Sequence, residues 1–191
     1  MKKKILLIGG GGHAKSVIDV IEQEGRFEVA GIIEKFVSES KPVLGYELIG
    51  TDDELPALRE HYDYVLVTVG QIESAKLRIK LYTRLKELGF MLPTIISPLA
   101  YVSKHATLGE GTVVMHHALV NAGAKVGANC IINSKALIEH DTVVEDHCHI
   151  STNAILNGGV HVAAQSFVGS GVVTKQGAQL FGFIKAGSIA K

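Results

Sequence analysis

The stretch INSKALIEHDTVV, residues 132–144, places an aliphatic residue at every sixth position. The same spacing continues in both directions, from Ile96 to Val168, and every one of these positions is aliphatic. The series weakens at Thr174 and recovers at Leu180. A period of six fits neither an amphipathic helix nor an alternating strand.

A second series lies four residues after each aliphatic position, and its members are small or β-branched. It comprises Ala100, Ala106, Thr112, Ala118, Ala124, Cys130, Ala136, Thr142, Cys148 and Ala154. This pattern is typical of a parallel β-helix of hexapeptide repeats. The aliphatic residue fills the interior, and the small residue lets the chain turn a corner. Three sides make one coil, so residues eighteen apart should stack, and we expect the series to run without interruption to Ala186.

Cys130 and Cys148 both belong to the small-residue series and are one coil apart. They should therefore stack inside the β-helix. A disulfide is geometrically conceivable there, but free interior thiols are favoured in a cytosolic protein.

The composition is that of a soluble globular protein. The chain has 191 residues, 47% of them hydrophobic and 20% charged, with a formal net charge of zero. Its only basic block is residues 2–4, which argues against nucleic acid or an anionic membrane as a partner. The apolar run that follows is too short for a secretory signal or a membrane span, so we expect a cytoplasmic protein.

The N-terminal part alternates strands with helices, which predicts a small parallel sheet. The expected strands are residues 3–8, 27–33 and 64–69, and the expected helices are residues 14–24 and 73–88. This is about half of a doubly wound nucleotide-binding domain. We therefore predict an α/β half-Rossmann domain at residues 1–95, followed by a β-helix domain at residues 96–191.

The turn Gly9-Gly10-Gly11-Gly12-His13-Ala14 matches the G-x-G-x-x-A form of the dinucleotide fingerprint. Glu34 follows the second strand, where a ribose-binding acid is expected. The sheet is too short for a complete dinucleotide, so one nucleotide is the preferred ligand, and His13 could contact its sugar or phosphate. The alternative is that the glycines merely form a tight turn.

The repeat contains several histidines, none of which falls on either interior series, so all should point outward. They are His105, His116, His117, His140, His147, His149 and His161.

Among them, His140 stands out because Glu139 and Asp141 flank it. A carboxylate that orients an imidazole is what a general base needs. The residue one coil later is Gly158, which should leave room for a substrate and an exposed N–H for an oxyanion. A zinc site built from the histidines fits the spacing poorly, so no metal is predicted. No serine or cysteine nucleophile beside a base is apparent, which favours direct transfer.

The chain resembles the bacterial sugar acyltransferase family that joins a small nucleotide-binding domain to a left-handed β-helix. Its members include sialic acid O-acetyltransferases and UDP-N-acetylbacillosamine N-acetyltransferases. The resemblance covers the whole chain. It is carried by the glycine-rich turn ending at His13, by Gly70 and Asn133, and by residues 138–141, 149–151 and 168–169.

The resemblance implies a homotrimer that binds acetyl-CoA between neighbouring prisms and a nucleotide sugar in the N-terminal domain. His140 would be the base, Asp141 its partner and Asn133 a residue that positions the acceptor. The residues implied to contact the coenzyme are His149, Gly158, Ser170 and Gly187. Those implied to contact the nucleotide sugar are Gly11, Gly12, His13, Glu34, Lys35 and Gly70.

The chain departs from the family pattern in two places. Glu34 is followed by Lys35, where relatives often have a second acid, so the local charge is reversed. The C-terminal residues 187–191, GSIAK, lack the proline of the family's Gly-x-Pro-Ala-Lys tail.

The expected function is transfer of an acetyl group from acetyl-CoA to the amine of a nucleotide-linked amino sugar, in surface glycan biosynthesis. O-acetylation of a sialic acid-like sugar is the nearest alternative. An NAD-dependent oxidoreductase and a non-catalytic scaffold are alternatives from other classes.

Overall fold

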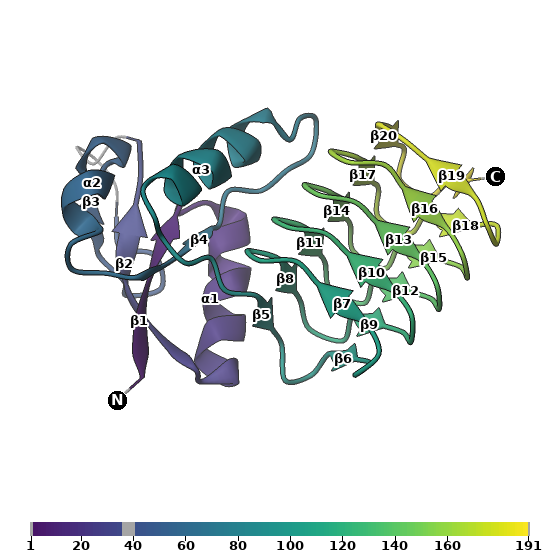
Figure 1. Cartoon of the computed structure of the whole chain (residues 1–191), viewed down its shortest axis with the longest axis horizontal. Coiled ribbons are helices and arrows are strands. Elements are labelled where there is room, and N and C mark those ends of the chain that lie inside the picture. The colour runs from purple at the N-terminus through teal and green to yellow at the C-terminus, as the bar shows by residue number, and fades with distance from the viewer. Residues whose placement is uncertain (1, 36–40, 191) are drawn as a thin grey trace. The chain divides into compact units, whose positions relative to one another are not determined.

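The computed structural model describes residues 2–35 and 41–190. The chain divides into two compact units (Figure 1). The first comprises Met1–Gly70 and Lys76–Pro93, and the second comprises Gln71–Ala75 and Thr94–Lys191. A short segment from the predicted N-terminal range therefore belongs to the second unit. The last residue of the tail considered above, Lys191, lies outside the described residues.

The first unit contains a parallel four-stranded sheet of order β3-β2-β1-β4. Its strands are β1 (Lys3–Ile8), β2 (Phe27–Ile33), β3 (Leu48–Gly50) and β4 (Tyr64–Val67). The prediction of a small parallel sheet is confirmed, and two of the predicted strands have the expected bounds. The short strand β3 was not predicted, because three residues are too few to show an alternating pattern.

Three helices and a 3₁₀ turn complete this unit. They are α1 (Gly12–Glu24), η1 (Asp52–Glu54), α2 (Leu55–Leu58) and α3 (Lys76–Glu87). Helix α1 ends at Gly25, whose φ of 74° is left-handed, as expected for a glycine that terminates a helix. Thr51 and Glu54 form a capping box at η1. Among the described helices, none has the length and apolar character that a bilayer span requires.

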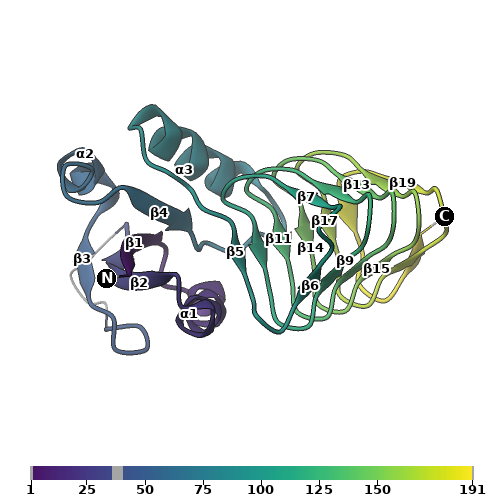
Figure 2. The ribbon, with the colours of Figure 1, turned by 60° about the horizontal axis from the view of Figure 1, so that its bottom comes forward.

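The helices cover both faces of the sheet (Figure 2). On one face, Leu6 and Ile8 of β1 share a hydrophobic cluster with Leu55 of α2 and with Leu81 and Leu85 of α3. Because side chains alternate along a strand, the intervening β1 residues face the other side, where α1 lies. The glycine-rich turn between β1 and α1 therefore sits at the carboxyl edge of the sheet.

The second unit is a left-handed parallel β-helix of seventeen two-residue strands, which stack into three faces (Figure 1). The first face consists of β5 (Ile95–Ile96), β8 (Val113–Val114), β11 (Ile131–Ile132), β14 (His149–Ile150), β17 (Phe167–Val168) and β20 (Phe183–Ile184). The second face consists of β6 (Tyr101–Val102), β9 (Leu119–Val120), β12 (Leu137–Ile138), β15 (Ile155–Leu156), β18 (Val173–Thr174) and β21 (Ile189–Ala190). The third face consists of β7 (Thr107–Leu108), β10 (Lys125–Val126), β13 (Val143–Val144), β16 (His161–Val162) and β19 (Gln179–Leu180).

The interior of this prism is built from the two predicted series. Most second residues of the strands and most small corner residues form one buried cluster, and those of the first and last coils pack against it partly buried. Cys130 and Cys148 lie within it, fully buried and not joined by a disulfide, and the Cys148 N–H donates to Cys130 Sγ at 3.4 Å. The prediction that both cysteines lie in the interior is confirmed.

The final coil is shorter than predicted. Phe167 pairs with Phe183 and Val173 with Ile189, sixteen positions apart rather than eighteen. Only two residues separate β19 from β20, so Ile184 takes the interior position that the six-residue count assigns to Ala186. The prediction that the series ends at Ala186 is therefore wrong.

The corners share a left-handed backbone residue at a spacing of six. From residue 111 to residue 177, each corner has one residue with φ between 53° and 76°. Several of these residues are not glycine, including Asp141 at 60° and Asn129 at 53°. Such residues adopt this conformation at a cost that asparagine and aspartate partly offset by local hydrogen bonds.

Two adjacent valines of β13 test the interior assignment. Val144 is buried inside the prism, whereas Val143 points outward and is half-buried. We expect Val144→Ala to lower the free energy of unfolding by about 2 kcal/mol, since it removes buried methyl groups and leaves a cavity. Val143→Ala is the matched control and should lower it by less than half as much in urea denaturation. Equal losses would contradict the interior assignment.

Candidate functional site

His140 and Asp141 form a hydrogen-bonded pair at the edge between the second and third faces. The imidazole Nδ1 lies 2.9 Å from Asp141 Oδ2, and the side chains are 56% and 74% exposed. The left-handed backbone of Asp141 turns its carboxylate back towards the preceding ring. The hydrogen bond to Asp141 is the main cause that raises the pKa of His140 above 6.5, with charge from Asp141 and Glu139 adding to it.

Glu139 has a different role from Asp141. Its Oε2 accepts the His140 backbone N–H at 3.1 Å and the Asn121 side-chain amide at 2.8 Å. Of the two carboxylates that flank His140, the structure therefore pairs Asp141 with the ring and uses Glu139 to cap the corner.

Glycines lie against both members of the pair in the adjacent coils. A Cβ atom on Gly123 would meet Asp141 Oδ1 at 2.5 Å, and one on Gly158 would meet His140 Nε2 at 2.6 Å. The His140 ring therefore occupies the space that a side chain at position 158 would fill, and Gly158 is buried. Within the described residues, the Gly158 N–H has no hydrogen-bond acceptor.

The other predicted residues of the β-helix lie elsewhere on the prism. Asn133, Ser170 and Gly187 lie at the edge between the first and second faces, and His149 lies on the first face. The Ser170 hydroxyl is 2.9 Å from that of Ser151 in the preceding coil. A single copy of the chain therefore separates these residues from His140 by the width of the second face.

His149 points away from the prism interior, as expected, but it is only 7% exposed. Its Nδ1 lies 2.5 Å from the carbonyl oxygen of Gln71, and its Nε2 lies 3.1 Å from Asn133 Nδ2. No pattern in the sequence pointed to Gln71, which is far away along the chain and belongs to no repeat.

In the first unit, four predicted residues gather at the carboxyl edge of the sheet. Gly11 precedes α1 in an extended conformation, Gly12 begins the helix, and both are exposed with open space beside them. A Cβ atom on Gly70 would lie 3.7 Å from His13 Cβ. A helix N-terminus flanked by glycines can bind a phosphate through its N–H groups.

Glu34 is directed into the glycine-rich turn, where its Oε1 accepts the Gly10 N–H. Beside it, a cavity of about 100 Å³ is lined by Glu34, Lys35, Asp52 and apolar side chains. Lys35 is exposed. Asp52 was not among the predicted site residues, so its place in this cavity was missed.

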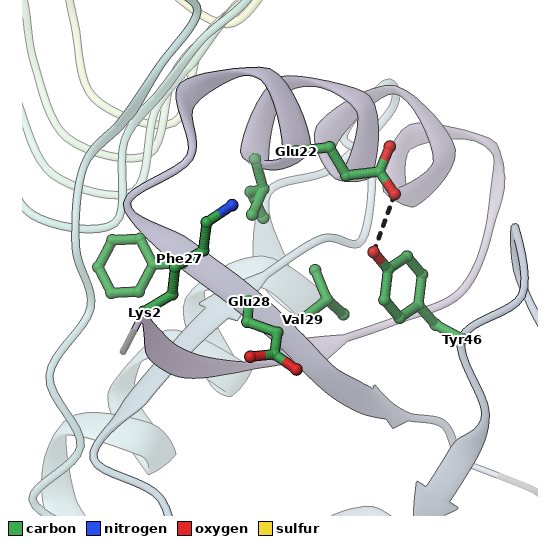
Figure 3. Close-up of a pocket in the computed structure, with 7 residues that line it drawn as sticks. Lys2, Glu22, Phe27, Glu28, Val29 and Tyr46 are labelled. Carbon is green, nitrogen blue, oxygen red and sulfur yellow. Dashed lines mark hydrogen bonds between the residues drawn. The ribbon is translucent and has the colours of Figure 1, made fainter.

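A second cavity, of about 320 Å³, lies at the opposite edge of the same sheet (Figure 3). It is lined by Lys2, Ile21, Glu22, Phe27, Glu28, Val29 and Tyr46. The Tyr46 hydroxyl donates to Glu22 at 2.8 Å, and burial together with this bond raises the pKa of Tyr46. Its place at the amino ends of the strands separates it from the glycine-rich turn.

Two other histidines of the prism also have hydrogen-bond partners in their side-chain surroundings. His161 lies 2.8 Å from Glu145 on the third face, a second histidine–carboxylate pair. Ser97 Oγ lies 2.7 Å from His116 Nδ1, a serine beside a base that the sequence did not reveal. Ser97 is 1% exposed and also accepts the Leu99 N–H, as a turn cap does.

A metal site was also considered from the sequence. Across residues 2–35 and 41–190, no three histidine, cysteine, aspartate or glutamate side chains gather as a metal site would require.

Comparison with known proteins gives three kinds of result. The model of the PglD N-terminal domain family matches residues 4–85. No curated protein sequence matches the chain. The structure of PerB from Caulobacter crescentus, in complex with CoA and GDP-perosamine, is similar with a TM-score of 0.90 and 34% identity. The match covers 98% of this chain and 88% of that one.

The acetyltransferase domain of PglB from Neisseria gonorrhoeae FA1090 is similar with a TM-score of 0.88 and 30% identity. This match covers 100% of the present chain and 92% of that domain. A structure of the same domain in complex with acetyl coenzyme A has the same TM-score and identity, with coverage of 98% and 90%.

The pairing of His140 with Asp141 predicts the ionisation of the imidazole. In an NMR titration of the histidine C2 protons, His140 should titrate above 6.5, because the carboxylate favours its protonated form. Asp141→Asn should shift this pKa downwards while keeping the left-handed corner, which asparagine tolerates. Asp146→Asn, at another edge of the prism, is the control. A His140 titration that Asp141→Asn leaves unchanged would refute the pairing.

Proposed function

Because the chain belongs to the family of PglD-type sugar acetyltransferases, we propose that it moves the acetyl group of acetyl-CoA to the amine of a nucleotide-linked amino sugar. Two relatives support this substrate class. PerB binds CoA and GDP-perosamine, and the PglB domain binds acetyl coenzyme A. Within this chain, the proposal depends on the exposed His140 imidazole and its hydrogen bond to Asp141. A cytoplasmic place of action, where both substrates are available, is part of the proposal.

His140 acts as the general base in this mechanism. Asp141 accepts the Nδ1 hydrogen, so Nε2 carries the lone pair that removes a proton from the attacking amine. The amine nitrogen bonds to the thioester carbon, and the carbon–sulfur bond breaks as the tetrahedral intermediate collapses. The protonated imidazole returns the proton to the leaving thiolate, which departs as CoA. The acetyl group passes directly between substrates, without a covalent enzyme intermediate.

The backbone at Gly158 stabilises the oxyanion of that intermediate. Gly158 lies against the His140 ring, and its N–H has no acceptor within the described residues. A backbone donor that is already in position acts on the developing charge without reorganisation. At the equivalent corner positions Ala122 and Ser134, the N–H is bonded to the preceding asparagine side chain.

Acetyl-CoA binds between neighbouring copies of a homotrimer. His149, Ser170 and Gly187 belong to the first face and to its edge with the second, whereas His140 lies across the second face. A site that uses His140 together with the coenzyme residues must therefore combine two copies. The edge between the second and third faces of one copy must lie beside the edge between the first and second faces of the next copy. The separation of the predicted residues on one prism supports this arrangement.

The second face supplies a surface for such packing. The outward residue of every strand on this face is apolar, and none is fully buried: Tyr101, Leu119, Leu137, Ile155, Val173 and Ile189. The corresponding residues of the third face are mostly polar or charged: Thr107, Lys125, Val143, His161 and Gln179. A continuous apolar ladder on a soluble protein is typical of a protein–protein interface.

The first unit binds the nucleotide sugar at the carboxyl edge of its sheet. Gly11 and Gly12 let a phosphate approach the N-terminus of α1, and His13 and Gly70 lie beside them. Glu34 and Lys35 line the adjacent cavity, where the lysine favours an anionic group of the nucleotide.

Release of thiol from acetyl-CoA tests the role of His140. We expect His140→Ala to lower kcat by about 10²–10⁴-fold, because the base is lost. His161→Ala is the matched control, since His161 is also paired with a carboxylate on the same prism. It should leave kcat within roughly twofold of the unmodified protein. Unchanged turnover in His140→Ala would refute the proposed base.

A panel of acceptor sugars tests whether the acetyl group is transferred to an amine or to a hydroxyl. Acetyl transfer to UDP- or GDP-linked amino sugars, without transfer to sialic acids, would support N-acetylation. Transfer to sialic acids alone would replace it with the O-acetyltransferase alternative, which uses the same base.

Oligomeric state tests the second face as an interface. Leu137→Glu places a charge in the apolar ladder, so light scattering coupled to size exclusion should show monomers instead of trimers. Lys125→Glu, which puts the same side chain on the third face, should leave the trimer intact. A Leu137→Glu protein that stays trimeric would exclude this face from the interface.

Complementation tests whether the site is shared. Copies with His140→Ala and copies with Asn133→Ala should each be impaired, but their coexpression should restore part of the activity. Restoration is expected because some mixed trimers contain a site with both natural residues. No restoration in isolated mixed trimers would place the site within one chain.

A further inference from the structure

The segment Gln71–Ala75 belongs to the same compact unit as the β-helix. Its first residue, Gln71, is buried, with 2% of its surface exposed. The Gln71 Nε2 donates to the carbonyl of His147 at 3.0 Å and approaches that of Ser166 at 3.5 Å. These two carbonyls belong to consecutive coils, so the glutamine side chain anchors the segment to both.

The backbone carbonyl of Gln71 determines which nitrogen of His149 carries a hydrogen. This oxygen lies 2.5 Å from His149 Nδ1. A carbonyl oxygen can only accept, so Nδ1 must be the donor. The anchored glutamine thereby selects the Nδ1–H form of the ring.

Asn133 determines the state of the other nitrogen. Its Oδ1 accepts the Ser134 backbone N–H at 2.8 Å, which fixes the orientation of the amide. Its Nδ2 therefore faces His149 Nε2, at 3.1 Å. An amide nitrogen can only donate, so Nε2 must accept and the ring must be neutral. The Gln71 carbonyl at one end and the Ser134 N–H at the other therefore allow only one assignment of hydrogens to the His149 ring and the Asn133 amide.

We infer that Gln71 is a positioning residue for the transfer site. It holds His149 as the neutral Nδ1–H tautomer, and His149 in turn aims the Asn133 amide, whose second hydrogen is left to donate to a substrate oxygen. The inference rests on the proposed function only for what Asn133 then contacts. It excludes His149 as an acid or base in the reaction, since both of its nitrogens are committed to hydrogen bonds.

A simpler role for Gln71, as an anchor of its segment and nothing more, makes a different prediction. In that case the loss of its side chain would change stability but would leave the tautomer of His149 unaltered. The protonation of the two ring nitrogens therefore separates the two roles, independently of any activity.

The test uses the full chain labelled with ¹⁵N-histidine and two-bond ¹H–¹⁵N correlation spectra at neutral pH. In the unmodified protein, His149 should show a protonated Nδ1 and an unprotonated Nε2. Gln71→Met keeps the length of the side chain but removes its donor, and should produce a mixture of tautomers. Its kcat should fall roughly tenfold with little change in the KM for acetyl-CoA, as for other residues that orient a ligand or base. Gln176→Met, the same change at an exposed position, should alter neither.

A second variant keeps the inference testable if Gln71→Met does not fold. Asn133→Asp replaces the donor facing Nε2 by an acceptor, so His149 should become doubly protonated. An unmodified protein with hydrogen on Nε2, or a folded Gln71→Met protein with an unaltered tautomer, would overturn the inference. Correct spectra in a protein that transfers no acetyl group would refute the proposed function and leave the positioning role standing.

Discussion

The hydrogen-bond ladder between successive coils is the constraint on which the β-helix depends. The first residue of a strand and the residue that follows the strand donate to carbonyls of the next coil, as Ile131 does to Cys148 and Asn133 does to Ile150. Because every coil repeats this pattern, a residue has the same kind of neighbour above and below it. Interior positions must then fill a column of uniform width, and each corner must turn the chain in the same way. The aliphatic series, the small-residue series and the left-handed corners are three results of that one requirement.

The candidate site depends on the same stacking of residues in successive coils. His140 and Asp141 occupy corner positions where most coils carry an outward side chain, yet the adjacent coils have glycine at the positions that face them. The absence of side chains there lets the imidazole and the carboxylate lie along the prism surface and meet each other. The pair is therefore positioned by the absence of side chains at Gly123 and Gly158 as well as by its own hydrogen bond.

Features that depend on the repeat could be predicted from the sequence, and those that depend on contacts outside it could not. The interior columns, the interior position of both cysteines and the His140–Gly158 stacking all follow from counting residues. The short final coil escaped prediction because Leu180 and Ala186 still satisfy a count of six, although the chain turns after only two residues.

Other features depend on long-range or orientational information that the sequence does not carry. The burial of His149 depends on Gln71, which lies on a segment without periodic signal. Glu34 follows β2, as counting along the sequence indicates, but its orientation towards the Gly10 N–H is set by side-chain geometry that spacing does not encode.

The sixteen-residue final coil also shows what the ladder tolerates. Its strands β19, β20 and β21 still pair with β16, β17 and β18 of a full eighteen-residue coil, although the corner between β19 and β20 is two residues shorter. A corner at that edge can therefore lose two residues while the strands on all three faces stay in register.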